Sequence, residues 1–170
     1  ASGVYNEHLL TQGLKLVKGY RRGQGFIFRN DDPRFQDFQD SFQERFEEML
    51  YDPELRMINR NRGSGTRVLI DGLLGKHQPQ GFLYEAKSHQ AVAAAVAQSR
   101  ADWGVAIRSV AEDQGLGFIP LQDEEYDFII PESRLQKPAV QALIGLLDEK
   151  PIIERLEQMG LIRNPGKDRS

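Results

Sequence analysis

The segment 56-RMINRNRGSGTRVLIDGLL-74 contains the pattern on which the fold assignment rests. Residues 56–60 are typical of a short strand, and residues 66–74 have the composition of a helix. Between them lies the turn 63-GSGT-66, which combines two glycines with two hydroxyl side chains. A strand, a short turn and a helix in this order form the repeating unit of α/β folds. The segment therefore predicts one strand–turn–helix unit of an α/β domain.

The same alternation extends through the rest of the chain. Other segments rich in β-branched and aromatic residues predict strands at 14–18, 25–29, 81–85, 101–107, 116–121 and 126–130. Apolar residues at helical spacing predict helices at 33–50, 89–100, 110–115, 139–147 and 152–159. The acidic run 123–125 is expected to be a solvated turn. We therefore predict an α/β fold with a mostly parallel sheet flanked by helices.

The overall composition excludes several classes of function. The 170 residues fit a single domain, and the formal net charge of −3 argues against a generally basic nucleic-acid binder. There are no cysteines, and His8, His77 and His89 lack the spacing of metal ligands. No apolar run reaches the ~18 residues of a membrane span. We therefore expect no metal site, no direct binding to nucleic acid and no membrane span.

The turn 63–66 has the chemistry of an anion cradle. Backbone N–H groups at a helix N-terminus are unpaired and carry partial positive charge, and glycines let a ligand approach them closely. A cation at Arg67, in the first helical turn, is disfavoured by roughly 0.3–1 kcal/mol, a conflict that a bound anion would remove. Three arginines flank the turn: Arg60, Arg62 and Arg67. The candidate ligand-binding residues here are Arg62, Ser64, Gly65, Thr66 and Arg67.

A simpler interpretation of this turn stands beside the first. Serine and threonine at a helix start commonly act only as caps, and arginines beside a turn commonly pair with surface carboxylates. The glycine spacing matches neither a phosphate-binding P-loop nor a dinucleotide fingerprint. The Gly-x-Ser-x-Gly pattern of a nucleophile elbow is absent as well, so we assign no catalytic residue.

Two further segments are candidates for the same site. Ser88 can cap the helix that begins at His89, and the two residues would then direct a second helix N-terminus at the ligand. The alternatives are an ordinary capped core helix and a surface histidine. In the segment 21-RRGQG-25, Arg22 and Gln24 could supply donors from a hinge between lobes. The alternative for that segment is a basic surface loop.

The segment 59-NRNRGSGTRVL-69 closely resembles a signature of a known family, the periplasmic-binding-protein-like (type II substrate-binding) domain associated with MoeA-type molybdopterin-biosynthesis proteins and helix-turn-helix regulators. The resemblance covers nearly all of residues 3–131, in the family's order. Other stretches that carry it are 3-GVYN-6, 20-YRRGQG-25, 88-SHQAVAAAVA-97, 101-ADWGVAI-107 and 116-LGFIPL-121, continuing to Tyr126-Asp127. This sequence departs from the family where Ser99 and Ala106 stand, since glycine is frequent there.

The resemblance implies one periplasmic-binding-protein-like domain over residues 1–170, a two-lobed fold with a ligand cleft. Residues 14–115 would form mainly the second lobe, and 116–170 would return to the first lobe and end in helices. By comparison with the family, we expect the N-terminal part of the first lobe to be missing, and the apolar surface left exposed predicts a homo-oligomer.

The functional context of the family implies a cytoplasmic sensor module for a small oxyanion. Molybdate or tungstate is the expected ligand, sulfate and phosphate are alternatives, and no cofactor is expected. The chain itself would not be an enzyme. It would serve a fused or partner regulator of transcription or a molybdopterin-biosynthesis domain. Two other hypotheses remain open: a part of a molybdopterin molybdotransferase-like protein, and a purely structural interaction domain.

Overall fold

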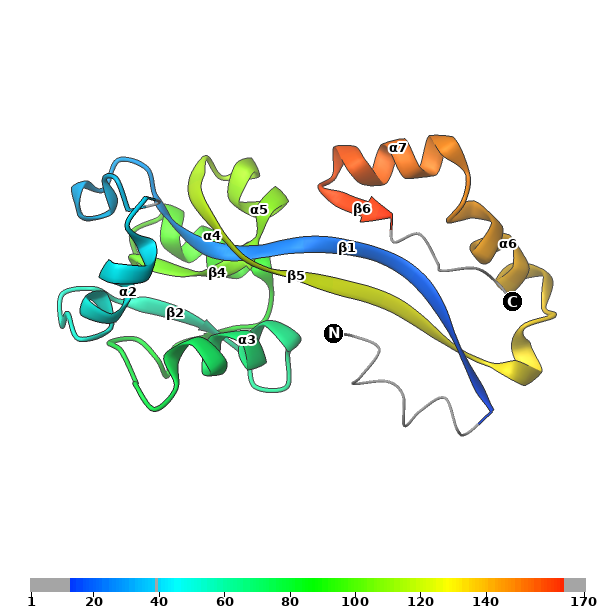
Figure 1. Cartoon of the computed structure of the whole chain (residues 1–170), viewed down its shortest axis with the longest axis horizontal. Coiled ribbons are helices and arrows are strands. Elements are labelled where there is room, and N and C mark those ends of the chain that lie inside the picture. Colours follow the sequence, from blue (N-terminus) through cyan, green and yellow to red (C-terminus); the bar gives the residue numbers. More distant parts are fainter. Residues whose placement is uncertain (1–12, 39, 164–170) are drawn as a thin grey trace. The chain divides into compact units, whose positions relative to one another are not determined.

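The computed structural model describes residues 13–38 and 40–163, which divide between two compact units (Figure 1). The central unit is residues 24–122, and the terminal unit combines the described residues before 24 with those after 122. Two long strands, β1 (Leu14–Arg29) and β5 (Leu116–Pro131), contribute residues to both units. The motif 3–6 and His8 lie outside the described residues.

The sheet has the strand order β3-β2-β4-β1-β5. Strand β2 (Met57–Arg60) is parallel to both of its neighbours, β3 (Glu85–Ala86) and β4 (Trp103–Ile107). Strand β1 is antiparallel to β4, and Phe26 lies opposite Val105. The sheet is therefore mixed, and its parallel part lies where strands alternate with helices in the sequence. The predicted α/β class with flanking helices is confirmed.

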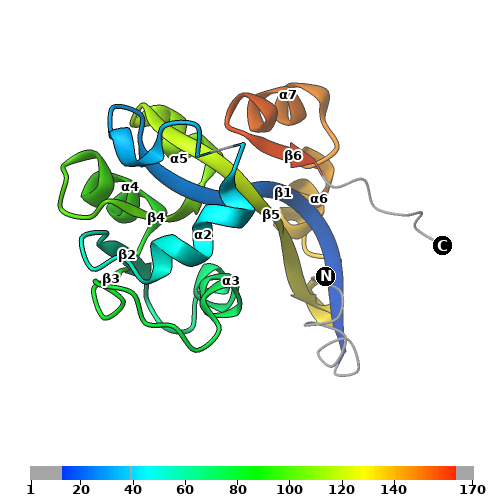
Figure 2. The ribbon, with the colours of Figure 1, turned by 60° about the vertical axis from the view of Figure 1, so that its left-hand side comes forward.

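Helices cover both faces of the sheet in the central unit. Figure 2 shows α4 (His89–Ala97) on one side of β2 and β4, with α2 (Phe42–Leu50) and α3 (Gly65–Leu74) on the other. The short helix α5 (Arg108–Asp113) packs on the α4 side, through Val110 and other buried residues. On the α2 and α3 side the core is aromatic. The Phe26 ring packs there against the rings of Phe28, Phe35, Phe38, Phe42, Phe46 and Trp103.

The terminal unit contains the C-terminal elements of the described chain. Strand β6 (Leu161–Arg163) pairs antiparallel with the first half of β1. The 3-10 helix η2 (Glu132–Arg134) follows β5, and then come α6 (Pro138–Leu146) and α7 (Lys150–Gln158). Across the described residues, no helix is both long and apolar enough to span a membrane.

Two expected strand interruptions are absent. Residues 14–18 and 25–29 belong to the single strand β1, and 116–121 and 126–130 belong to the single strand β5. The prediction that 123–125 is a solvated turn was therefore wrong. The physical reason is cross-strand pairing: Arg22 bonds Glu124 at 2.7 Å, and Lys18 bonds Asp127 at 3.1 Å. These pairs stabilise an extended backbone where the local sequence suggested a turn.

Other elements also begin or end at residues that differ from the prediction. The helix expected at 33–50 is a 3-10 helix, η1 (Pro33–Phe35), followed by α2. It breaks because Gln36 is extended and Asp37 has a positive φ of 55°. The strand expected at 81–85 is reduced to β3, since Gly81 has a φ of 89° and begins a turn. Strand β6 has no counterpart among the predicted elements.

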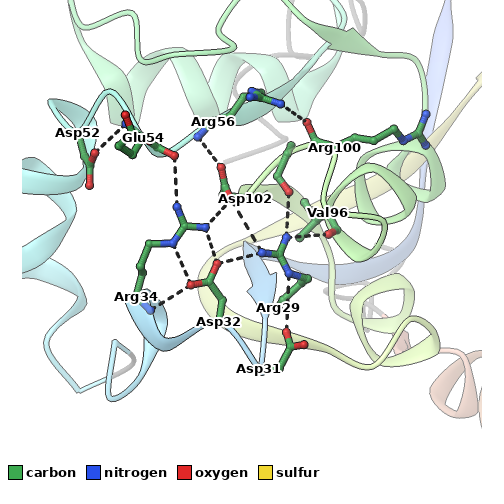
Figure 3. Close-up of polar contacts among 11 residues, drawn as sticks. Arg29, Asp31, Asp32, Arg34, Asp52, Glu54, Arg56, Val96, Arg100 and Asp102 are labelled. Atoms are coloured by element: carbon green, nitrogen blue, oxygen red, sulfur yellow. Dashed lines mark hydrogen bonds and ion pairs between the residues drawn. The ribbon is translucent and has the colours of Figure 1, made fainter.

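A charged network holds together the loops at the amino ends of β2 and β4 (Figure 3). The carboxylate of Asp32 accepts hydrogen bonds from Arg29 at 3.0 Å and from Arg34 at 2.6 Å. Asp102 accepts from Arg34 at 2.5 Å and from the backbone N–H of Arg56 at 2.8 Å. Hydrogen bonds from Arg34 hold the pKa of Asp32 below its usual range, although burial opposes them. This network therefore stabilises the fold at the edge opposite the helix N-termini.

Candidate anion-binding site

The carboxyl ends of the parallel strands place two helix N-termini at the same edge of the sheet. β2 leads into α3, and β3 leads into α4. The strands are paired with Arg60 opposite Ala86, and the Asn61 N–H donates to the Ala86 carbonyl at 3.1 Å. The two turns that follow must therefore start next to each other. In open α/β sheets this edge is where ligands bind.

The turn before α3 is built as the sequence predicts. Gly63 has a φ of 83°, a conformation that disfavours any side chain. Ser64 is the N-cap, since its Oγ accepts from the Arg67 N–H at 3.2 Å and donates to the Asn61 carbonyl at 3.0 Å. Gly65 is exposed at the first helical position, whereas Thr66 is buried. Helix geometry leaves the first N–H groups without an intrahelical acceptor, so they can bind an anion.

The N-terminus of α4 is capped by a serine in the same way. The Oγ of Ser88 accepts from the Ala91 N–H at 3.1 Å, which confirms Ser88 as the N-cap of α4. His89 is the first residue of that helix and is buried, so it is not the surface histidine that the sequence favoured. Residues Ser64, Gly65, Ser88 and His89 are thus brought to one edge of the sheet.

The structure distinguishes among the three arginines of the signature. Arg62 is 80 % exposed, and its Nε lies 3.8 Å from Glu85 Oε1. Arg67 is buried, but Asp71 and Glu85 already bind its guanidinium. Arg60, the last residue of β2, is only 7 % exposed and shares the strand face of Ile58, which packs with the α4 core. Arg60 and Arg67 are therefore the two buried arginines of the signature at the carboxyl edge, whereas Arg62 is exposed.

Arg22, which the sequence predicts as a ligand-binding residue, lies in the terminal unit. Its Nε donates to Glu124 at 2.7 Å, and its guanidinium lies over the Tyr126 ring at 5.4 Å from the centroid. Arg22 is therefore engaged within its own unit.

Gln24 is the buried polar residue of the segment 21–25. It belongs to the central unit and lies opposite Ile107, at the carboxyl end of β4. It is 4 % exposed, and its Oε1 has no hydrogen-bond partner among the residues that the structure describes. A buried amide in this state is uncommon and marks the same edge of the sheet as a polar site. Burial, which local sequence does not reveal, separates Gln24 from the exposed Arg21 and Arg60 from the exposed Arg62.

The described part of the chain contains no cluster of three or more histidines, cysteines or carboxylates suited to a metal ion. The donors at this edge are backbone N–H groups, hydroxyls and a guanidinium. Such donors suit the oxygen atoms of a small anion.

Replacing Ser88 by alanine tests the second N-terminus as a cap. We expect Ser88→Ala to lower the free energy of unfolding by about 1 kcal/mol, because the Ala91 N–H loses its acceptor. Ser88→Thr keeps a capping oxygen and should lose less. Chemical denaturation of the three proteins measures the difference. Equal losses for both variants would contradict the capping role.

Comparisons with known proteins agree with this architecture. A family model described as "PBP superfamily domain" matches residues 2–148. A phosphate ABC transporter substrate-binding protein from Clostridium perfringens, solved with bound phosphate, has a TM-score of 0.68 at 14 % identity. The alignment covers 92 % of this chain and 74 % of that one. An ABC-type phosphate transport receptor from Vibrio cholerae has a TM-score of 0.57 at 12 % identity, over 90 % and 74 % of the two chains.

A relative in sequence is the uncharacterized protein YvgK of Bacillus subtilis (strain 168). It is 35 % identical over 109 residues, which are 61 % of this chain. The match spans only 35 % of the length of that relative. Because the family model covers most of the chain and the solved structures share its fold, the chain belongs to the periplasmic-binding-protein (PBP) superfamily.

Proposed function

We propose that this chain is a binding module for a small oxyanion, held at the carboxyl edge of β3, β2 and β4. One observation carries the proposal: two serine-capped helix N-termini start at the same edge of the sheet, at which the buried Arg60 also lies. Helix N-termini attract anions through unpaired N–H groups and the helix dipole. Arg60 adds a full positive charge with a donor geometry that suits oxyanions. The phosphate bound by the Clostridium perfringens structure supports this class of ligand.

Molybdate or tungstate is the finer proposal for the ligand, and it rests on the resemblance of residues 59–69. Both ions, like phosphate and sulfate, are tetrahedral oxyanions, so the same N–H groups could bind any of the four. In this proposal the chain binds and does not catalyse. An attached or partner domain, either a regulator or a molybdopterin-biosynthesis enzyme, uses the bound ion.

The first test is thermal unfolding with and without millimolar molybdate, tungstate, phosphate and sulfate. A ligand at 100 times its dissociation constant stabilises the folded state by about 2.7 kcal/mol, which is a clear rise in Tm. A rise with molybdate and tungstate alone supports the finer proposal, and a rise with phosphate alone replaces it by a phosphate module. No rise with any of the four anions contradicts the binding proposal.

The second test locates the site. We expect Arg60→Gln to weaken binding of the anion by about 2 kcal/mol, or roughly 30-fold, because a charged hydrogen bond to the ligand is lost. Arg100→Gln is the matched control, since Arg100 is exposed and lies beyond the C-terminal end of α4. Isothermal titration calorimetry measures both variants. Unchanged affinity in Arg60→Gln would place the ligand elsewhere.

A further inference from the structure

The side chain of Arg67 is held by this chain's own residues from several directions. Its Nε donates to Asp71 Oδ1 at 2.7 Å, and its Nη1 donates to Glu85 Oε1 at 2.8 Å and to the Arg60 carbonyl at 3.2 Å. Its guanidinium also lies 4.8 Å from the centroid of the Phe82 ring. The Nε and Nη1 atoms of Arg67 are thus used by contacts within this chain. Its placement is therefore that of a residue acting on the site through its neighbours.

Glu85 is the neighbour whose negative charge Arg67 neutralises. It is the first residue of β3 and lies opposite Asn59 of β2, one position before the end of that strand. Its carboxylate is one-third exposed, so it is not fully screened by water. A carboxylate so close to the α3 N-terminus would repel an anion bound there. Arg67 Nη1 neutralises it directly, whereas the exposed Arg62 approaches only to 3.8 Å.

The same contacts also fix the geometry of the edge. Through Glu85 and the Arg60 carbonyl, one guanidinium joins the start of β3 and the end of β2 to the first turn of α3. Burial opposes the charge of Arg67, but its hydrogen bonds to Asp71 and Glu85 outweigh this and raise its pKa. The Arg67 guanidinium therefore remains positively charged beside Glu85.

We propose that Arg67 is a positioning residue of the anion site, which shields the Glu85 carboxylate from the ligand and aligns the α3 N-terminus without touching the ligand. This inference rests on the proposed function. It changes the role that the sequence predicted for Arg67, from ligand contact to control of the local charge. It also makes Glu85 the residue that limits anion affinity.

The test is a double-mutant cycle in the full chain, with binding of phosphate and of molybdate measured by calorimetry. Arg67→Gln should lower affinity roughly tenfold, because an unshielded carboxylate now repels the anion. Glu85→Gln should raise affinity a few-fold. The double variant Arg67→Gln/Glu85→Gln should return to within about threefold of the wild type. Glu112→Gln is the matched control: it removes an exposed carboxylate from an i,i+4 pair with Arg108 on α5 and should change affinity little.

Salt dependence gives a second readout. The loss in Arg67→Gln should shrink as ionic strength rises, since added ions screen the repulsion of a partly exposed charge. Arg67→Lys retains the charge and serves as the variant to use if Arg67→Gln does not fold. Because its ammonium still offsets the charge of Glu85, it should keep affinity within about threefold of the wild type.

The possible outcomes separate this inference from the proposed function. If the wild type binds neither anion, the proposed function fails, and this inference fails with it. If the wild type binds but the double variant is as weak as Arg67→Gln, Arg67 contacts the ligand and the shielding role is overturned. A lower Tm in Arg67→Gln with no change in affinity would leave only a structural role, which also overturns the proposal.

Discussion

Replacing Trp103 by alanine is expected to lower the free energy of unfolding by about 3–5 kcal/mol. Trp103 is 1 % exposed, and its ring stacks on Phe26 at a centroid distance of 5.2 Å. It also meets Phe46 edge-on at 6.3 Å and pairs with Met57 in the register of β2 and β4. Removing the indole would leave a cavity in the aromatic core that neighbouring rings cannot fill. Because natural domains have a free energy of unfolding of only about 5–15 kcal/mol, Trp103→Ala would lose much of its stability.

Trp103→Phe is the control that separates packing from polarity. The Trp103 Nε1–H has no hydrogen-bond partner within the described ranges, so its removal frees no buried acceptor. Phenylalanine retains a ring on Phe26 and should therefore cost about half as much as alanine or less. Urea denaturation followed by far-ultraviolet circular dichroism measures both variants. Similar losses in the two variants would contradict ring packing on Phe26 as the source of this stability.

Replacing Asp32 by asparagine is expected to lower the free energy of unfolding by about 3 kcal/mol. The Asp32 side chain is 3 % exposed and accepts from both Arg29 and Arg34. Asparagine can still cap η1 by accepting from the Arg34 N–H, so the loss reports on the charge. The value is at the lower end for a broken buried ion pair because Arg34 is partly exposed and keeps Asp102 as a partner.

The lowered pKa of Asp32 also predicts how the free energy of unfolding depends on pH. Its pKa is lower in the folded state, so its contribution is present above the unfolded pKa of about 4 and is lost as pH falls through the folded value. The difference in free energy of unfolding between the wild type and Asp32→Asn should therefore be constant near neutral pH and shrink below about pH 4. Asp31→Asn is the control: that carboxylate is 86 % exposed, and its change should stay within about 0.5 kcal/mol. If the difference in free energy of unfolding between the wild type and Asp32→Asn persisted at low pH, the ionic explanation would be refuted.

Much of the central unit could be predicted because its signals are local. The alternation of strands and helices between residues 57 and 107 follows from hydrophobic periodicity and glycine placement. Ser64 and Ser88 were recognisable as caps because capping involves a backbone N–H only three residues away. By contrast, the continuity of β1 and β5 depends on ion pairs such as Arg22–Glu124, whose partners are 102 positions apart. No window of local sequence contains that information.

The sequence by itself therefore determined the α/β class, the glycine-rich turn before α3 and the two capped helix N-termini. The tertiary structure alone decided which arginines of the signature are buried and which partners they bind. Arg60, Arg62 and Arg67 are chemically identical in the sequence, but β2 buries Arg60, solvent surrounds Arg62, and Glu85 binds Arg67 from 18 positions away. The physical reason is that caps and periodicity act within one helical turn, whereas burial and charge pairing depend on strands brought together by folding.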